Sequence, residues 1–321
     1  MKFRQLILTF ALGFIAFGCS TDDNTVDVDT EVVDPVVEEE GVEEEDIPSN
    51  GFVTSTMSFT SVNGGATSQY NVNYESGLAV LGFNPNSASN SQNVFTYDSL
   101  ARQISWVSSS DSGVQIEVDY SYANSGLYSQ IVRQDYAQDR TTILNFEYEE
   151  EYVNVVETIV EDGIEISNLT RVIYVDDDGR IIRSESGFYF YDFVYNESGD
   201  ILSVETTSAS SNTLIRQDTF SYGVAEIHFG FNRPDGVDIV KQRSMLSWLG
   251  SGYVLNTSFF VSISQFPLES ISSLSASSGN SQEVLTVIYT TDEDNKCLNY
   301  EQVSVDVVSG SQTVTNINFE Y

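Results

Sequence analysis

The sequence predicts an all-β fold, an antiparallel meander of repeated hairpins. Two patterns carry this prediction: short runs with an apolar residue at every second position, and a tyrosine-containing turn that recurs along the chain. Residues 114–120, 303–307 and 314–319 each alternate apolar and polar side chains, which is typical of a strand with one buried face. Beyond Gly51 the chain is rich in Ser, Thr, Val, Ile, Tyr and Phe, most of which favour pleated, half-buried surfaces.

The recurring unit has a strand that ends in tyrosine, a turn of Asp, Asn, Ser and Gly, and a return strand that opens with Ile or Leu. The tyrosines of the series are Tyr97, Tyr122, Tyr148, Tyr174, Tyr195 and Tyr222. Their spacings are 25, 26, 26, 21 and 27 residues, which corresponds to one hairpin per unit. Glycine at the end of such a turn supplies a positive φ, and Ala101 occupies that position in the first copy.

Sequential hairpins pair with their neighbours in the chain, so we expect an open curved sheet or a partly closed one. Periodicity alone does not decide whether the sheet closes on itself or folds over as two sheets. Residues 235–266 interrupt the repeat, and residues 238–249 are the best helix candidate. We therefore expect a short helix-containing insert near residues 235–266 that plugs or caps one end of the sheet.

The tyrosine-turn-glycine copies resemble the YD repeats of the Rhs family and, more closely, the YD-like repeat lipoproteins of Bacteroidetes. The end of the chain, with residues 265–271 and a closing strand at 318–321, contributes to the resemblance. The literal dipeptide is kept only at Tyr97-Asp98. The resemblance implies a fold and a cellular location more than an activity. Rhs proteins use such repeats as a shell around a toxin, and this chain is too short to provide a closed shell and a cargo.

The first residues have the layout of a secretory signal, residues 1–18. Two basic residues precede an apolar run of twelve, residues 6–17, whereas about 20 are needed to cross a bilayer. The run ends at Ala-Phe-Gly-Cys19, which resembles a bacterial lipobox. The following Ser-Thr-Asp-Asp, residues 20–23, resembles the export signal of Bacteroidetes surface lipoproteins. We therefore expect a lipid on Cys19 and an outer-membrane location that faces the cell exterior.

The acidic residues of the chain divide between a tether and a folded domain. Residues 20–50 hold 13 acids with no basic or aromatic residue, so residues 19–50 are predicted to be the lipidated cysteine and a disordered tether. Residues 51–321 are predicted to form a single β-repeat domain, with 35 acidic and 11 basic residues. This charge argues against nucleic-acid binding, which depends on cations that displace counterions from phosphate.

The sequence offers little for catalysis. His228 is the single histidine and lies in a strand-like run, and no Gly-x-Ser-x-Gly motif accompanies it. The two cysteines are Cys19 and Cys297, so lipidation of the first leaves the second as a buried apolar residue. We expect a non-enzymatic binding or structural accessory module without cofactors. The alternative is a polysaccharide hydrolase that depends on two carboxylates, one of them in an apolar setting.

Aromatic and acidic residues supply the candidates for binding. Trp106 and Trp248 lie outside the repeated tyrosine position and are the candidates for a glycan or an envelope-protein partner. No metal is predicted. The weak candidates for calcium ligands are turn acids without EF-hand spacing, namely Asp176, Asp178, Asp292 and Asp294.

Overall fold

The computed structural model describes residues 56–63, 66–75, 78–223, 245, 246, 249, 267–276, 281–305 and 312–321. Its elements are eighteen β-strands. They are β1 (Thr56–Asn63), β2 (Ala66–Glu75), β3 (Leu78–Phe83), β4 (Gln92–Tyr97), β5 (Gln103–Ser110), β6 (Gly113–Tyr122), β7 (Tyr128–Asp135), β8 (Arg140–Tyr148), β9 (Tyr152–Glu161), β10 (Ile164–Val175), β11 (Ile181–Glu185), β12 (Tyr189–Tyr195), β13 (Ile201–Ser208), β14 (Leu214–Tyr222), β15 (Leu268–Ser275), β16 (Ser281–Thr291), β17 (Cys297–Val305) and β18 (Gln312–Glu320). The all-β prediction is confirmed.

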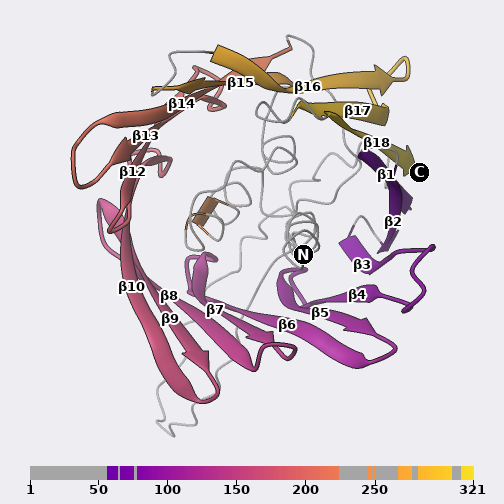
Figure 1. Cartoon of the computed structure of the whole chain (residues 1–321), viewed down its shortest axis with the longest axis horizontal. Helices are drawn as coiled ribbons and strands as arrows, with labels where there is room; N and C mark the ends of the chain where they lie inside the picture. The colour runs from indigo at the N-terminus through magenta and orange to yellow at the C-terminus, as the bar shows by residue number, and fades with distance from the viewer. Residues whose placement is uncertain are drawn as a thin grey trace, which may run out of the picture.

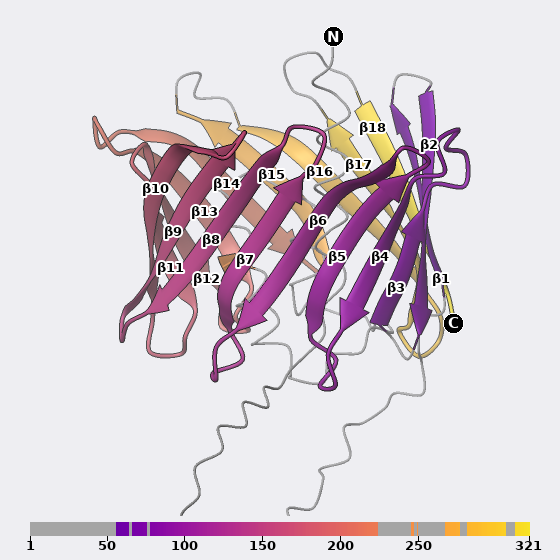
Figure 2. The same cartoon turned by 90° about the horizontal axis from the view of Figure 1, so that it is seen from below.

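The strands form one closed antiparallel barrel (Figure 1). Every strand pairs with its neighbours in sequence, and β1 pairs with β18 from Thr56↔Glu320 to Asn63↔Thr313. The strands are tilted against the barrel axis, as closure requires (Figure 2). The expectation of an open or partly closed sheet is therefore wrong. Period-two alternation fixes which face of a strand is buried, but closure depends on pairing between the two ends of the chain.

The expected helix-containing insert is also corrected, because every element with bounds in the described residues is a strand, and only Met245, Leu246 and Leu249 are described as helical. Most of residues 235–266 lies outside them. Met245, Leu246 and Leu249 are described and belong to the hydrophobic core, with exposed fractions of 2% or less. The Sδ atom of Met245 lies 3.7 Å from the Tyr195 hydroxyl, so these residues pack against the inner face of the wall.

The inner face of the wall is mainly hydrophobic because alternate side chains of each strand point inward. In β9 the buried positions are Val153, Val155, Glu157 and Ile159, and the residues between them are partly exposed. Inward side chains from all parts of the ring join one core, which includes Met57 of the first strand and Phe319 of the last. Burial of this apolar surface is the main force that stabilises the barrel.

Even-numbered strands end at one rim of the barrel, which we call the tyrosine rim. Here a tyrosine hydroxyl donates to a backbone carbonyl oxygen near the start of the preceding strand. The described pairs are Tyr97 with Ala79 (2.9 Å), Tyr122 with Gln103 (2.7 Å), Tyr148 with Tyr128 (2.6 Å), Tyr195 with Ile181 (2.6 Å), Tyr222 with Ile201 (2.8 Å), Tyr289 with Leu268 (3.0 Å) and Tyr321 with Cys297 (2.6 Å). The sequence repeat is thus a repeated hydrogen bond between adjacent strands.

Several turns at the tyrosine rim share a backbone conformation. In five of them, the backbone N–H of the first turn residue donates to the carbonyl oxygen four positions later, as from Asp98 to Arg102. The residue just before that carbonyl residue has a positive φ. The described examples are Ala101 (62°), Gly126 (79°), Gly179 (74°), Gly199 (80°) and Asn295 (59°). The predicted turn is confirmed, and Ala101 adopts the left-handed conformation in which glycine costs least.

Candidate functional site

Trp106 lies on the inner face of the wall. It belongs to β5, where it pairs with Phe95 of β4 and Val118 of β6, and its exposed fraction is 5%. Its indole Nε1–H is buried and has no hydrogen-bond acceptor among the described residues. A buried indole N–H usually has a partner. Its binding role remains a prediction, and Trp248 lies outside the described residues.

Asn93 and Tyr70 lie on the same inner face as Trp106. Asn93 is two residues before Phe95 on β4, and its Nδ2 atom donates to the Tyr70 hydroxyl. Burial raises the pKa of Tyr70 to about 12, although the Asn93 hydrogen bond lowers it in part. The tyrosine lies over Gly82, where a Cβ atom would be 2.1 Å from the hydroxyl oxygen, so any larger residue would displace it.

The three side chains Tyr70, Asn93 and Trp106 form what we call the lumen cluster. Within the described part of the chain, the Oδ1 atom of Asn93 is buried without a donor and the Trp106 Nε1–H without an acceptor. A water or hydroxyl group can both donate and accept, so it matches the two unmet atoms chemically. Alternation alone could have indicated that Trp106 faces inward. The contact between Asn93 and Tyr70 could not be predicted, because it joins β4 to β2.

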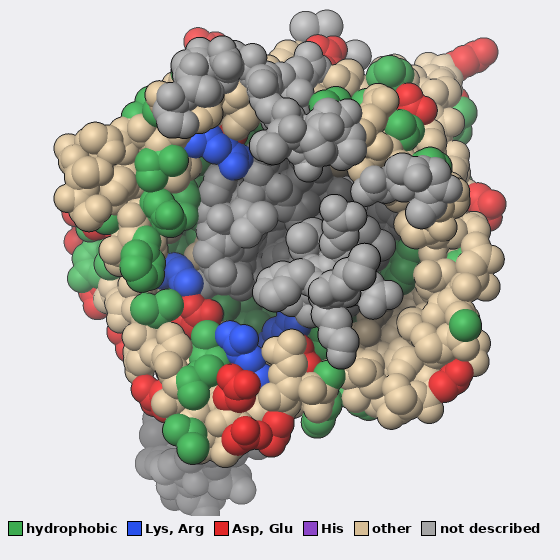
Figure 3. Space-filling model, in the orientation of Figure 1, with side chains coloured by type: hydrophobic (Ala, Val, Ile, Leu, Met, Phe, Trp, Pro, Cys, Tyr) green, Lys and Arg blue, Asp and Glu red, His purple; other side chains and the backbone are tan. Residues whose placement is uncertain are grey.

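Buried arginine–carboxylate pairs are a second feature of the inner face. Arg171 of β10 lies 2.7 Å from Glu157 of β9, and the side chains are 10% and 11% exposed. Arg216 of β14 lies 2.6 Å from Asp218, which also accepts from the Ser273 hydroxyl. In Figure 3, Lys and Arg side chains in view lie toward the inner edge of the ring, and several Asp and Glu side chains follow its outer edge.

These pairs bear on the hydrolase alternative. It requires two close carboxylates with one in an apolar setting, whereas Glu157 and Asp218 each contact a guanidinium group. A buried carboxylate paired with arginine has the partner that compensates its desolvation. Arg133 lies on the same inner face, and burial lowers its pKa while Asp135 raises it in part. These contacts give the hydrolase no support.

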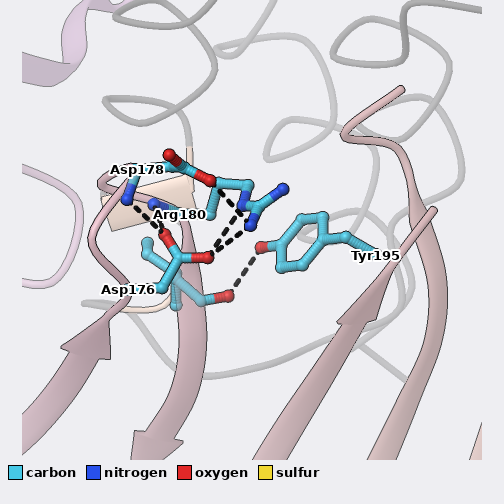
Figure 4. Close-up of polar contacts among 5 residues, drawn as sticks. Asp176, Asp178, Arg180 and Tyr195 are labelled. Atoms are coloured by element: carbon cyan, nitrogen blue, oxygen red, sulfur yellow. Dashed lines mark hydrogen bonds and ion pairs between the residues drawn. The ribbon is translucent and has the colours of Figure 1, made fainter. Parts of the chain in front are cut away.

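The acids Asp176 and Asp178 belong to a turn at the tyrosine rim (Figure 4). The Oδ1 atom of Asp176 accepts from the backbone N–H groups of Asp178 (3.1 Å) and Arg180 (2.8 Å). Its Oδ2 atom accepts from Arg180 Nε at 2.8 Å, and Asp178 pairs with the same guanidinium at 2.9 Å. That guanidinium lies 5.7 Å from the centre of the Tyr195 ring. Both carboxylates therefore have partners within the turn.

The turn at Asp292 repeats this arrangement. Its Oδ1 atom accepts from the backbone N–H groups of Asp294 and Lys296, each at 3.0 Å. The Lys296 ammonium lies 3.6 Å from the centre of the Tyr321 ring. Across the described ranges no group of three or more His, Cys, Asp or Glu side chains is placed to hold a metal ion.

Sequence reasoning missed the cation that follows the turn. Arg102, Arg180 and Lys296 occupy one position of the repeat, and each lies over the tyrosine that ends the next even-numbered strand, with Arg102 4.2 Å from the Tyr122 ring centre. A basic residue four positions after the turn aspartate, as in Asp98 and Arg102, is the signal that could have identified it. Cation–π contacts of this kind contribute to joining one turn to the next hairpin.

Two of the remaining sequence candidates, Cys19 and His228, lie outside the described residues. Cys297 is a free, fully buried cysteine whose pKa burial raises to about 12. A thiol with a raised pKa has little reactive thiolate at neutral pH, so Cys297 fits the predicted apolar role.

The outer face of the wall carries polar and charged residues at the middle of its strands. Glu117 of β6, Asp192 of β12, Glu205 of β13 and Glu301 of β17 alternate with buried inward side chains. Amides also pair across the outer face, as where Gln217 donates to Glu205 at 2.8 Å. A lipid-facing barrel instead needs an apolar band roughly 25 Å tall on this face. Exposed apolar side chains, such as Val194 of β12 and Ile288 of β16, also occur on the outer face.

Comparisons add solved structures of low similarity. No family model matches the chain, and no curated protein matches it. A porin-like protein from Bacteroides uniformis is 14% identical, with a TM-score of 0.42 and coverage of 83% of this chain and 97% of that one. A porin-like protein from Bacteroides vulgatus is 10% identical, with a TM-score of 0.41 and coverage of 84% and 98%.

The third structure is a Tc holotoxin pore from Photorhabdus luminescens, which is 9% identical, with a TM-score of 0.26 and coverage of 74% of this chain and 14% of that one. At these identities and TM-scores, the likenesses add nothing to what the fold itself shows. In the part of the chain that the structure describes, no helix is long and apolar enough to cross a membrane.

Proposed function

We propose that this chain is a surface-displayed lipoprotein of the outer membrane and that its barrel is a non-enzymatic binding or structural module. A lipid on Cys19 would hold it at the membrane, and residues 20–50 would space the barrel from the surface. The observation that carries the proposal is the set of carboxylates on the outer face, in the middle of β6, β12, β13 and β17. Charged side chains on a lipid-facing wall are destabilising, so a barrel with this surface needs a separate anchor.

The sequence supplies such an anchor. The order of basic residues, apolar run and cysteine in residues 1–19 is that of a lipoprotein signal, and the acidic stretch after it repels itself into an extended spacer. A spacer of about thirty residues extends on the order of 30 Å as a flexible coil. The two features together support a barrel displayed in water beside the membrane.

The test replaces residues 1–19 by a secretory signal that is cleaved without lipidation. We expect the parent protein to incorporate labelled fatty acid and to stay with the outer membrane after a carbonate wash. The replaced form should be released as a soluble, folded barrel with the β-sheet circular dichroism of the parent. Cys297→Ser is the matched control, because it changes the buried cysteine and should leave lipidation and membrane attachment intact.

Retention of the replaced form in the membrane after the wash would show that the wall itself binds lipid and would overturn the proposal. The exterior orientation has its own readout. Protease added to intact cells should remove the barrel of the parent protein. Protection of the barrel until the outer membrane is broken would place it on the inner side.

A further inference from the structure

At the rim opposite the tyrosine rim, the hairpin of β9 and β10 extends past the end of β11. β10 pairs with β9 from Ile164↔Glu161 to Tyr174↔Tyr152, but it pairs with β11 only from Val172 to Val175. Residues 164–170 therefore have one strand neighbour among the described residues, and their other edge faces the place where a longer β11 would lie. An unpaired strand edge presents a row of backbone N–H and C=O groups that a further strand can bind.

Three apolar side chains along this edge are exposed. Ile164, Ile166 and Leu169 have exposed fractions of 67%, 54% and 39%, and Phe188 in the adjoining β11–β12 turn has 69%. Apolar side chains that are exposed next to an unpaired edge are the usual mark of a strand-binding site. The pairing of β10 with β9 shifts register between Glu165 and Ser167, so the edge is irregular at Ile166.

The charges around the edge indicate the chemistry of its partner. Glu161 and Asp162 form the tip of the hairpin, Glu165 lies on the edge itself, and Glu185 ends β11 opposite Val172. Two nearby arginines are engaged with carboxylates, Arg171 with Glu157 and Arg183 with Glu185 and Asp192. A third, Arg140 of β8, lies opposite Glu161 in the strand register. The surroundings of the edge are therefore acidic.

We propose that the edge of β10 at residues 164–170 binds an extended segment of a partner protein that carries basic side chains among apolar ones. The partner's backbone would continue the sheet, its apolar side chains would contact Ile164 and Ile166, and its basic side chains would face Glu161 and Glu165. A second copy of this chain fits less well, because it would bring the same carboxylates to the edge. The inference names a partner for the proposed module and uses a surface remote from the lumen cluster.

The experiment measures binding of a fluorescent peptide to the soluble barrel by anisotropy. The peptide has roughly eight residues that alternate valine and lysine, about the length of the free edge at 3.3 Å per residue. Two comparison peptides carry glutamate in place of lysine, or the same lysine sequence with alternate backbone nitrogens methylated. We expect saturable binding of the lysine peptide at low salt, with each comparison peptide at least about tenfold weaker.

Ile166→Lys locates the binding site. It places a like charge on the edge and removes an apolar contact at an exposed position, so the lysine peptide should bind roughly tenfold more weakly while the barrel stays folded. Val94→Lys is the matched control, since Val94 is 39% exposed but lies on β4 between two paired strands, and it should leave binding unchanged.

Three outcomes would overturn the inference: no saturable binding of the lysine peptide, equal binding of the methylated peptide, or equal loss in the two variants. Self-association of the free barrel that Ile166→Lys abolishes would also overturn it, by identifying a second copy as the occupant. Because the experiment uses the barrel without its anchor, its failure leaves the proposed anchoring untouched, and failure of the anchoring leaves this result standing.

Discussion

The two rims of the barrel are built in different ways. At the tyrosine rim, hydroxyl groups bond to backbone carbonyl oxygens and the turns repeat one conformation, so neighbouring hairpins are joined in the same manner around most of the ring. The opposite rim has no such repeat among the described hairpins. There β10 stands beyond β11 and exposes apolar side chains. The difference indicates that the tyrosine rim stabilises the fold. At the opposite rim the strands end at different levels, which leaves surfaces available for binding.

Raising the pH should affect the tyrosine rim most. Burial raises the pKa of Tyr97, Tyr195 and Tyr289 above the ordinary value of about 10, and that of Tyr70 to about 12. Above pH of about 10 the unfolded chain releases these protons and the folded chain keeps them, so each such group lowers stability by about 1.4 kcal/mol per pH unit. We expect cooperative unfolding between about pH 10 and 12, followed by circular dichroism. Ionisation of all tyrosines near pH 10 with the sheet intact would contradict this.

Removal of the Glu157 side chain should cause the next largest loss of stability. This residue lies on the part of the wall near the rim opposite the tyrosine rim. Glu157→Ala removes the carboxylate that lies 2.7 Å from the buried Arg171 guanidinium. Loss of one member of a buried ion pair costs roughly 3–5 kcal/mol. Chemical denaturation measures this loss in the free energy of unfolding. The control replaces both Glu157 and Arg171 by leucine, and its free energy of unfolding should stay close to that of the parent, because no charge is left buried. A similar loss in the single and the double variant would assign the effect to packing.

The turn at Asp176 allows a sharper comparison between two neighbouring carboxylates. Asp176→Ala removes the acceptor of two backbone N–H groups and of Arg180 Nε, so we expect a loss of about 2 kcal/mol. Asp178→Ala removes one ion pair from a side chain that is 72% exposed, and its cost should stay below about 0.5 kcal/mol. Denaturant midpoints of the two variants measure the difference. Equal midpoints would mean that the turn does not depend on the Asp176 hydrogen bonds.

Backbone conformation in the same turns gives the smallest expected effect, with opposite signs at two sites. Ala101 has a φ of 62°, so Ala101→Gly should stabilise the barrel by about 1 kcal/mol. Gly199 has a φ of 80° and open space around a Cβ atom, so Gly199→Ala should destabilise it by about 1–2 kcal/mol without a steric clash. Thermal unfolding of the two variants checks the signs. A shift in the same direction for both would show that φ is not the deciding factor.

Local features of the fold could be predicted from the sequence. The tyrosine, the Asp or Asn after it and the positive-φ residue act within one turn, so their spacing is visible in the chain. Closure could not be predicted, because it depends on pairing between Thr56 and Glu320 at opposite ends of the domain. The Arg171–Glu157 pair likewise joins residues of two strands whose spacing has no sequence signature.

The candidate binding residues divide in the same way. Trp106 was identified as unusual because it falls outside the tyrosine repeat, but its inward direction and its neighbours Tyr70 and Asn93 depend on how β2, β4 and β5 assemble. The exposed edge of β10 was missed, because a long strand beside a short one is recognised only once both lengths and their pairing are known.

Closure by β1 and β18 has a consequence for how the chain can be made and rearranged. The last two open edges of the sheet are paired only when the final strand, β18, has been synthesised. Any truncation before β18 therefore leaves two open edges and exposes the inner apolar face. The cost of bringing such distant ends together grows only with the logarithm of the intervening length. Because Thr56 and Glu320 lie side by side, the start of the chain can be moved to a hairpin of the opposite rim by circular permutation, with the strand order of the ring preserved.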